Sequence, residues 1–539
     1  MPALPRRFVL PLACAGLSAS VTLLLWLFTS PGIDAPSHLF QTWLFSHGGF
    51  DIYNNYWYAG RYEFVNYSML YYAVAAQVGQ LGVLLPASAL MGGCFALVCS
   101  REWASAARGP SITFAITAPF IMMVGGTYPF LAGVASSLLG LALLQRRRRV
   151  WFGLAVLVTL AFSPLSFSLL CAVLAGVLLG RAQPLGALRS NRAAFGIVLA
   201  VFAVGVLLQR AFPSQGWYPY DLWDALIVLV FSLVGLWIAG TAAPTRSMRA
   251  MFVAYLALNL FAFLLKGPIG SNPSRLFAIA GAPMLWLTAN LNPRRSRLLV
   301  FPLIAAAVAL QVVPKVRDAY SAYENPAAAA SYWRPARQFV EEHRAQIAGY
   351  RVDAVSTWGH WEAYYVAKWR VPLARGWFRQ EDFPQNRVLY SPLGPAGYVH
   401  WLRQLGVRYV VLTSRPPDYS SRDEARLLAS GRTHLRVAFA TPNVKIFAVP
   451  SPRPLVSAPA RVRRLGYTTI TLAVPRRGSY RLAVTYTPYW ESPSACLSRT
   501  ADGMTRLFVR RPGIVLLHFA VTPERALETI AGRKPEPCG

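Results

Sequence analysis

Long apolar runs, separated by short polar connections, dominate the first 314 residues of the chain. A helix needs roughly 20 mostly apolar residues to cross a lipid bilayer. The pattern predicts about eleven membrane-spanning helices, several of them short and ending at Pro or Gly. The predicted spans cover residues 8–30, 81–99, 111–125, 129–144, 150–162, 165–179, 193–208, 225–240, 250–265, 276–289 and 298–313.

The pattern changes after residue 314, where helical and strand periodicities alternate. Residues 332–346 and 398–405 repeat apolar positions at helical spacing, whereas 408–413 and 444–449 alternate as strands do. We therefore predict a small α/β domain over residues 315–450, preceded by a membrane domain over 1–314.

The last part of the chain, residues 451–539, contains short alternating runs typical of a β-sandwich. Turn residues between neighbouring runs predict two hairpins. One joins 468–474 to 480–486, and the other joins 505–509 to 514–521.

Composition and charge place the chain in a membrane. The sequence is 55% hydrophobic and 14% charged, against about 25% charged in soluble domains. Although the net charge is +31, its distribution does not indicate nucleic-acid binding. Sixteen of the twenty basic residues before 315 fall in clusters separated by even numbers of spans, the distribution expected of cytoplasmic connections. This predicts a cytoplasmic N-terminus and an extracytoplasmic C-terminal region.

The first apolar run, 8–30, also has a second interpretation, a cleavable signal peptide. The run is longer than a typical signal core, and no small-x-small cleavage site follows it. We therefore expect a retained anchor.

The first outer loop, residues 31–67, holds three of the six acidic residues of the membrane half. Asp34 lies where the first span leaves the hydrocarbon, so partial desolvation would make its carboxylate a better base. The simpler interpretation is that Asp34 caps the helix that follows it. The local sequence leaves both open.

Aromatic and amide residues follow in the same loop and continue to the second span. Such residues suit sugar binding, because aromatic faces stack on sugar rings and amides pair with hydroxyls. The simpler interpretation is that interfacial Tyr and Trp anchor the protein in the membrane and that His38 is a structural interface histidine. The candidate substrate-binding residues are His38, Asn55, Trp57, Tyr58, Arg61 and Tyr71.

The order of a first span, an Asp-x-x-x-His pair (Asp34 and His38), an aromatic loop and a Tyr-rich helix resembles glycosyltransferases of the GT-C fold. The chain looks most like bacterial membrane proteins grouped as 6-pyruvoyl-tetrahydropterin-synthase-related, a name that does not imply that enzyme's activity. The resemblance continues through residues 360–365 and 374–380. It implies a GT-C-like bacterial cell-membrane enzyme that uses a polyprenyl-phosphate sugar and a glycan or glycolipid acceptor.

If the role of the first-loop acid in GT-C enzymes is carried over to this chain, the resemblance implies that Asp34 is the general base of an inverting transfer. The chain has no paired Asp-x-Asp at this position, so no motif supports a divalent metal, although the sequence leaves a metal open, and no other cofactor is expected. A lipid-phosphate leaving group needs a cation. The short loop 266–275 supplies Lys266 and Arg275, with Asn272 in a turn between them, although both cations also suit interfacial snorkelling.

Two further features concern the region after residue 314. Cys496 and Cys538 are the only cysteines there, so a disulfide between them is expected in an oxidising compartment. His360 and Glu362 have the residue types of an acid/base pair, but they fit the core of the domain equally well.

Two other functions remain open from the sequence. A transporter or lipid-linked-sugar flippase usually carries ionisable residues at mid-membrane, and the predicted span interiors contain none. A non-catalytic assembly or glycan-binding scaffold would leave Asp34 as a cap only.

Overall fold

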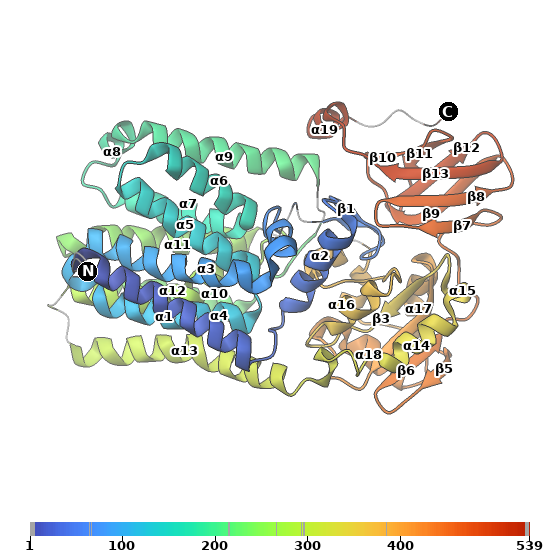
Figure 1. Ribbon diagram of the computed structural model, residues 1–539, viewed down its shortest axis with the longest axis horizontal. Coiled ribbons are helices and arrows are strands. Elements are labelled where there is room, and N and C mark those ends of the chain that lie inside the picture. Colours follow the sequence, from blue (N-terminus) through green and yellow to red (C-terminus); the bar gives the residue numbers. More distant parts are fainter. Residues whose placement is uncertain are drawn as a thin grey trace. The chain divides into compact units, whose positions relative to one another are not determined.

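Each apolar run predicted to cross the membrane forms a helix in the computed structural model (Figure 1). The structure describes residues 6–63, 65, 67–213, 216–265, 267–292, 294, 297–383, 385–533 and 538. The eleven helices are α1 (Arg6–Phe28), α3 (Tyr71–Glu102), α4 (Arg108–Gly125), α5 (Tyr128–Gln145), α6 (Arg149–Phe162), α7 (Pro164–Leu179), α9 (Arg192–Ala211), α10 (Leu222–Ala239), α11 (Arg246–Leu264), α12 (Arg275–Leu291) and α13 (Arg297–Tyr323).

Length and apolarity single out seven of these helices as able to cross a bilayer within the described residues. The number rises to eight if α7 and the short α8 (Pro184–Ser190), which are bent by 118°, form one span. The helices α4, α6, α7 and α12 are shorter or less apolar, so the count of eleven spans stays a prediction.

The chain folds into two compact units. The first contains Met1–Ala35, Tyr67–Val206 and Trp217–Glu324, and the second contains Pro36–Asn66, Leu207–Gly216 and Asn325–Gly539. The first outer loop therefore folds with the region after residue 324. The domain limits at residues 314 and 450 stay predictions.

Small residues let the helices of the first unit approach closely. A Cβ atom on Gly92 of α3 would lie 2.6 Å from the carbonyl oxygen of Cys14 in α1. One on Gly176 of α7 would lie 2.6 Å from the Cα of Met251 in α11. The hydroxyl of Ser18 donates to the carbonyl of Ala115 at 2.9 Å. Inside a bilayer the hydrophobic effect does not drive helices together, so close packing and interhelical hydrogen bonds of this kind hold them in contact.

A four-stranded mixed sheet forms one part of the second unit, in the order β3-β4-β6-β5. β3 (Arg351–Ala354) is parallel to β4 (Val407–Thr413), while β5 (Arg436–Ala440) and β6 (Val444–Ala448) add antiparallel neighbours. Its helices are α14 (Arg334–Glu342), α15 (Arg344–Ile347), α16 (Trp361–Lys368), α17 (Pro395–Gln404) and α18 (Arg422–Ala429). The single helix expected over 332–346 is in fact two, divided at His343.

Two antiparallel sheets form the other part, with orders β10-β13-β8-β7 and β11-β12-β9. Apolar side chains of both sheets share one buried core, as in a sandwich. The strands are β7 (Arg461–Leu465), β8 (Thr469–Val474), β9 (Gly478–Thr485), β10 (Trp490–Glu491), β11 (Ala495–Arg499), β12 (Met504–Val509) and β13 (Gly513–Phe519), followed by α19 (Pro523–Ile530).

The four strands predicted in this region form close to the predicted residues, whereas β7, β10 and β11 are not predicted, and both predicted hairpins are wrong. β8 pairs with β13 and β7, whereas β9 pairs with β12. The turns at 475–477 and 510–512 therefore connect strands of different sheets. A turn signal marks a chain reversal, but burial of the apolar faces decides which strands pair.

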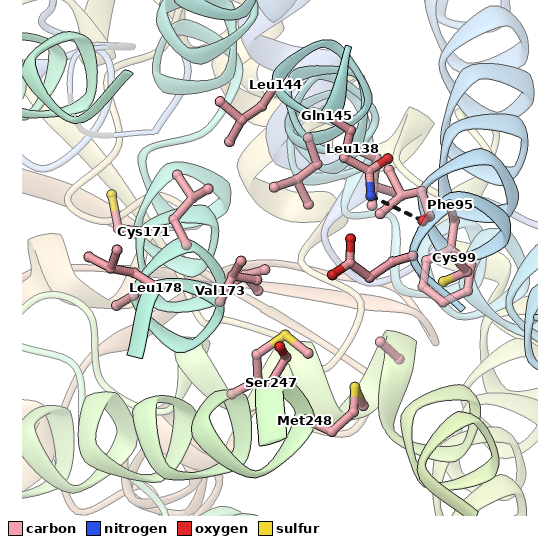
Figure 2. Close-up of a pocket in the computed structure, with 18 of the residues that line it drawn as sticks. Phe95, Cys99, Leu138, Leu144, Gln145, Cys171, Val173, Leu178, Ser247 and Met248 are labelled. Atoms are coloured by element: carbon pink, nitrogen blue, oxygen red, sulfur yellow. Dashed lines mark hydrogen bonds between the residues drawn. The ribbon is translucent and has the colours of Figure 1, made fainter. Parts of the chain in front are cut away.

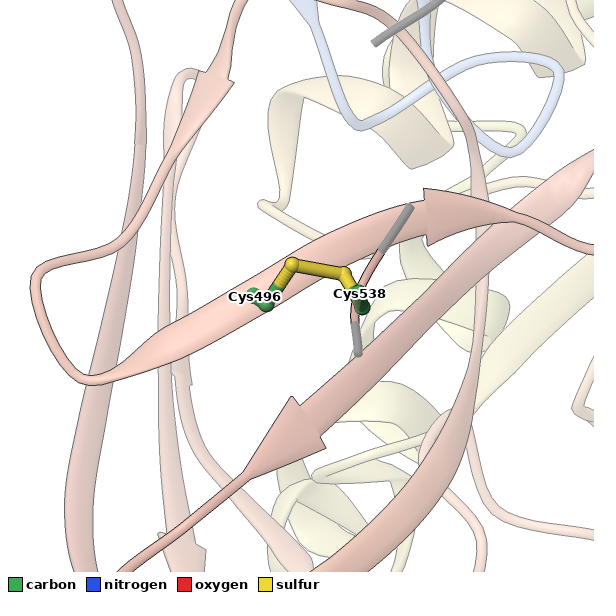
Figure 3. Close-up of a disulfide and its surroundings, with 2 residues drawn as sticks. All are labelled: Cys496 and Cys538. Carbon is green, nitrogen blue, oxygen red and sulfur yellow. A yellow bond between two sulfur atoms is a disulfide. The ribbon is translucent and has the colours of Figure 1, made fainter. Parts of the chain in front are cut away.

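A disulfide joins Cys496 on β11 to Cys538, 42 residues later (Figure 3). It ties the end of the chain to the three-stranded sheet. Because a cross-link over such a loop restricts the unfolded chain, the Cys496→Ser variant is expected to lose about 2–4 kcal/mol of stability in the second unit. Hydrogen exchange of the intact protein, followed at β12, measures this loss. Equal protection in the variant and the wild type would contradict it.

Candidate functional site

Asp34 lies in the turn between α1 and α2 (Ala35–Gly48), packed against the end of α4. Its backbone N–H donates to the carbonyl of Gly125 at 3.1 Å. Gly126 ends α4 with φ +72°, and a Cβ there would lie 2.6 Å from the nitrogen of Ala35. A Cβ on Gly32 would collide with the carbonyl of Val124. The two glycines therefore allow the backbone contact that positions Asp34.

The carboxylate of Asp34 pairs with the guanidinium of Arg275, the first residue of α12. The distance from Arg275 Nη2 to Asp34 Oδ2 is 3.4 Å. The two side chains are 12% and 27% exposed, respectively, so the pair is mostly but not completely buried. The guanidinium also lies 5.7 Å from the ring centre of Phe130, within cation–π range.

Tyr67 is a third member of this cluster. Its phenol is hydrogen-bonded to the side chain of Arg275. Burial raises the pKa of Tyr67, and the negative charge of Asp34 raises it further. The phenol therefore stays protonated, and the cluster brings together a carboxylate, a guanidinium and a neutral hydroxyl.

Tyr255 of α11 fixes the beginning of α12. Its hydroxyl accepts from the N–H of Phe277 at 3.2 Å and lies 3.1 Å from the carbonyl of Pro273, to which it donates. These bonds satisfy groups that a helix end leaves without intrahelical partners. The backbone of Arg275 is consequently fixed at the beginning of a helix, and this positions its charged side chain.

The other predicted phosphate-binding residues differ in their placement. Lys266 lies outside the described residues. Asn272 begins a short 3₁₀ turn, η3 (Asn272–Ser274), and its amide donates to the carbonyl of Ile269 at 2.7 Å. That bond closes the turn before Arg275, so Asn272 shapes the loop.

Most of the predicted sugar-binding residues are buried in the second unit. The amide of Asn55 donates to the carbonyl of Gly466 at 3.0 Å, and the indole of Trp57 donates to that of Ala363 at 3.2 Å. Burial raises the pKa of Tyr58 well above its ordinary value. Arg61 lies 4.3 Å from the ring centre of Phe378. A sugar reaches these side chains only if the loop leaves this core.

The remaining two candidates, His38 and Tyr71, are also fully buried. His38 lies in α2 and Tyr71 is the first residue of α3. The phenol of Tyr71 donates to the side-chain oxygen of Gln80 at 2.5 Å. This bond spans the break in α3 at Gly79, where φ is +78°, and favours a structural role for Tyr71.

A second charged cluster lies inside the α/β part of the second unit. Arg375 donates two bonds to Asp382, at 3.0 and 2.7 Å, and both side chains are almost fully buried. Burial works against the charge on Asp382, but the guanidinium of Arg375 outweighs it and holds the pKa of Asp382 below its usual range. The cluster is consistent with a structural ion pair.

His360 and Glu362 lie beside this cluster. His360 Nδ1 is 3.5 Å from Glu362 Oε1, and its Nε2 is 2.8 Å from Arg379 Nη2. Glu362 accepts from the hydroxyl of Thr357 at 2.7 Å. Since each group is buried and has protein partners, the arrangement favours the core interpretation over an acid/base pair.

Breaking the buried pair has a large expected cost. The Asp382→Met variant should lose about 3–5 kcal/mol in the second unit, because it removes the carboxylate that binds the buried Arg375 guanidinium through two hydrogen bonds and leaves the more distant carboxylate of Glu424, at 3.8 Å. The exposed pair of Arg426 and Asp423 provides a control. Arg426→Met should change stability by less than about 1 kcal/mol. Hydrogen exchange at β4 in the intact protein compares the two, and equal effects would contradict the assignment.

An apolar cavity of about 560 Å³ lies within the first unit, between α3, α5, α7, α9, α11 and α12 (Figure 2). Leu138, Leu144, Val173 and Leu178 contribute to its lining. An ion pair between Glu102 and Arg181, at 3.5 Å, belongs to the lining as well. Leu276, which follows Arg275 in the chain, also lines it.

No group of three or more His, Cys, Asp or Glu side chains among the described residues is arranged to hold a metal ion. The candidate site brings together Asp34, Arg275 and Tyr67, a carboxylate beside a guanidinium and a phenol.

The apolar helices and the sheet-containing second unit define a multi-pass membrane protein with a large non-membrane part. No protein-family model and no curated protein matches the sequence at a significant level.

The chain is similar to several solved structures, including a mycobacterial enzyme and an archaeal one. The mycobacterial arabinofuranosyltransferase AftD matches 83% of it at 16% identity with a TM-score of 0.47, and the chain spans 40% of AftD's length. The apo oligosaccharyltransferase of Archaeoglobus fulgidus matches 75% of it at 9% identity and a TM-score of 0.47, over 69% of that chain. At these scores, function has to be argued from the chain's own side chains.

Proposed function

We propose that the chain is a GT-C-like glycosyltransferase that moves a sugar from a polyprenyl-phosphate carrier to a cell-envelope glycan or glycolipid. The observation that carries the proposal is the pairing of Asp34 with Arg275, two residues 241 positions apart that the sequence analysis proposes as the base and as the phosphate-binding cation. A base and a phosphate-binding cation have to meet at one place for this reaction. The resemblance to the 6-pyruvoyl-tetrahydropterin-synthase-related membrane proteins belongs to the same proposal.

The chemistry assigns one role to each side chain. Asp34 takes the proton from the acceptor hydroxyl, whose oxygen attacks the anomeric carbon of the donor sugar. The bond from that carbon to the phosphate oxygen breaks, with inversion, and polyprenyl phosphate leaves. Arg275 stabilises the negative charge that develops on this phosphate, and Tyr67 donates a further hydrogen bond to it.

The ion pair itself has a function in this scheme. Before the donor binds, Asp34 and Arg275 neutralise each other in a partly buried place, where an isolated charge would be costly. A phosphate has more negative charge than one carboxylate and accepts two bonds from a guanidinium. Donor binding therefore draws Arg275 toward the phosphate and frees the carboxylate of Asp34 to act as the base.

The apolar cavity is the proposed place for part of the donor's hydrocarbon chain, because Leu276, the residue after Arg275, is part of its lining. The basic clusters orient this scheme in a bacterial cell membrane, with the N-terminus in the cytoplasm and Asp34 at the outer face. Membrane lipid, a lipid-linked donor and a glycan acceptor are thus the proposed partners.

A transfer assay tests the proposal. The full-length protein in lipid nanodiscs is given a panel of polyprenyl-phosphate sugars with envelope glycan fragments, and release of polyprenyl phosphate is followed. We expect polyprenyl phosphate to be released only when the acceptor is present. Movement of an intact lipid-linked sugar between leaflets of sealed vesicles, without release, would instead establish a flippase.

A further inference from the structure

A basic pocket of about 500 Å³ lies at the end of the helical unit that carries the connection between α5 and α6. We name it the arginine pocket. Its lining consists of Arg101, Leu143, Arg146, Arg148 and Trp151. Three guanidinium-bearing residues and two apolar ones thus meet at one place, from the last turns of α3 and α5 and the first turn of α6.

The backbone explains why alternate arginines of the connection line the pocket. α5 ends in a turn in which the N–H of Arg148 donates to the carbonyl of Leu143 at 3.0 Å. Arg147 occupies the left-handed position of this turn, with φ +58°, where glycine is usual. This turn places Arg146 and Arg148 in the lining and leaves Arg147 outside it.

A second contact brings Arg101 to the same place. The amide of Gln145, the last residue of α5, donates to the carbonyl of Val98 in α3 at 3.2 Å (Figure 2). The ends of α3 and α5 are therefore tied together, and Arg101 lies in the last turn of α3.

The positive charge of the pocket is not balanced by the protein. In the part of the chain that the structure describes, no ion pair within 4 Å involves Arg101, Arg146 or Arg148, and the neighbouring acid Glu102 pairs with Arg181. The negative ends of the α3 and α5 helix dipoles each offset about half a positive charge, whereas the three arginines carry three full charges. The beginning of α6 adds positive potential of its own. The pocket therefore favours an anion.

An apolar stripe on α6 identifies the kind of anion. Val150, Trp151, Leu154 and Leu157 are 83%, 59%, 50% and 45% exposed, and their spacing puts them on one side of the helix. The stripe begins at Trp151 in the pocket and continues along α6. In a membrane protein such a stripe faces hydrocarbon chains. A ligand that fits both features has a phosphate head and acyl tails.

We propose that the arginine pocket binds the headgroup of an anionic membrane phospholipid, whose acyl chains lie along the α6 stripe. Guanidinium groups bind phosphate with two parallel hydrogen bonds, which an ammonium cannot do. The proposal is independent of the sugar-transfer function, because the pocket contains neither Asp34 nor Arg275.

Lipid binding to the full-length protein tests the proposal by native mass spectrometry, with phosphatidylglycerol, phosphatidylcholine and inorganic phosphate as separate probes. Wild type should retain phosphatidylglycerol in preference to phosphatidylcholine. The double variant Arg146→Ala/Arg148→Ala should bind phosphatidylglycerol about 10- to 30-fold more weakly, since each surface arginine contributes to attraction by an anionic lipid. Trp151→Ala should weaken phosphatidylglycerol binding without changing that of inorganic phosphate.

A matched double variant provides the control. Arg189 and Arg192 are exposed basic residues of the same unit outside the pocket lining. Arg189→Ala/Arg192→Ala removes the same charge and should leave phosphatidylglycerol binding within about twofold of wild type. Equal losses in the two double variants would overturn the proposal in favour of diffuse surface charge. Inorganic phosphate bound as tightly as phosphatidylglycerol would overturn it in favour of a free-anion site.

Discussion

Replacing Asp34 by Asn is expected to lower kcat for sugar transfer by about 10²–10⁴-fold, the usual contribution of a positioned general base. The amide has nearly the same shape as the carboxylate and still accepts a hydrogen bond from Arg275, but it cannot take the proton of the acceptor hydroxyl. The KM for the lipid donor should not rise, because the variant removes the carboxylate that competes with the donor phosphate for Arg275. Initial rates of polyprenyl-phosphate release at saturating donor and acceptor measure the effect.

Asp221→Asn is the matched control for this change. Asp221 caps α10 by accepting from the N–H of Trp223 at 2.7 Å, and Asn caps a helix equally well. This variant should keep wild-type kcat. If Asp34→Asn lost both activity and thermal stability while Asp221→Asn lost neither, Asp34 would be a structural residue and its role as the base would be rejected.

Replacing Arg275 by Gln is expected to reduce kcat by about 10²–10³-fold and to raise the KM for the lipid donor as well. Loss of one preorganised electrostatic partner of a transition state has a cost of this size. The donor phosphate also loses its cation in the ground state, whereas Asp34→Asn leaves that cation in place and should not raise the KM. Steady-state kinetics over a range of donor concentrations separates the two patterns.

Arg275→Lys distinguishes charge from geometry at this position. An ammonium keeps the charge but cannot bind a phosphate through two parallel bonds, so intermediate activity is expected. Because Tyr255 holds the beginning of α12, the fold should tolerate the change. Wild-type kinetics in Arg275→Gln would exclude contact between this residue and the donor phosphate.

The sequence predicts the helical unit well because its signal is local. An apolar run long enough to cross a bilayer leaves few alternatives to a helix, and each predicted run coincides with one. The same logic predicts that Asp34 and Arg275 lie at one face of the membrane, since each residue borders a predicted span. Their separation of 3.4 Å depends on packing between α1, α4 and α12, which no local pattern contains.

Features that depend on distant parts of the chain could not be predicted from the sequence. The aromatic loop around Trp57 has a composition that suits sugar binding and a protein core equally, and only its partner Ala363, 306 residues later, favours the core. The turn at 475–477 has hairpin residues but joins two sheets. Tyr67 and Tyr255, which hold Arg275 and the beginning of α12, give no local signal that separates them from other tyrosines at membrane interfaces.

The most direct test of the proposed site is a cryo-EM structure of the full-length protein in lipid nanodiscs with polyprenyl phosphate, the proposed leaving product. Our account predicts phosphate density against the guanidinium of Arg275, with the carboxylate of Asp34 released from its ion pair and facing the space that the sugar occupies. Phosphate density at any other cation, with the Asp34–Arg275 pair intact, would contradict it.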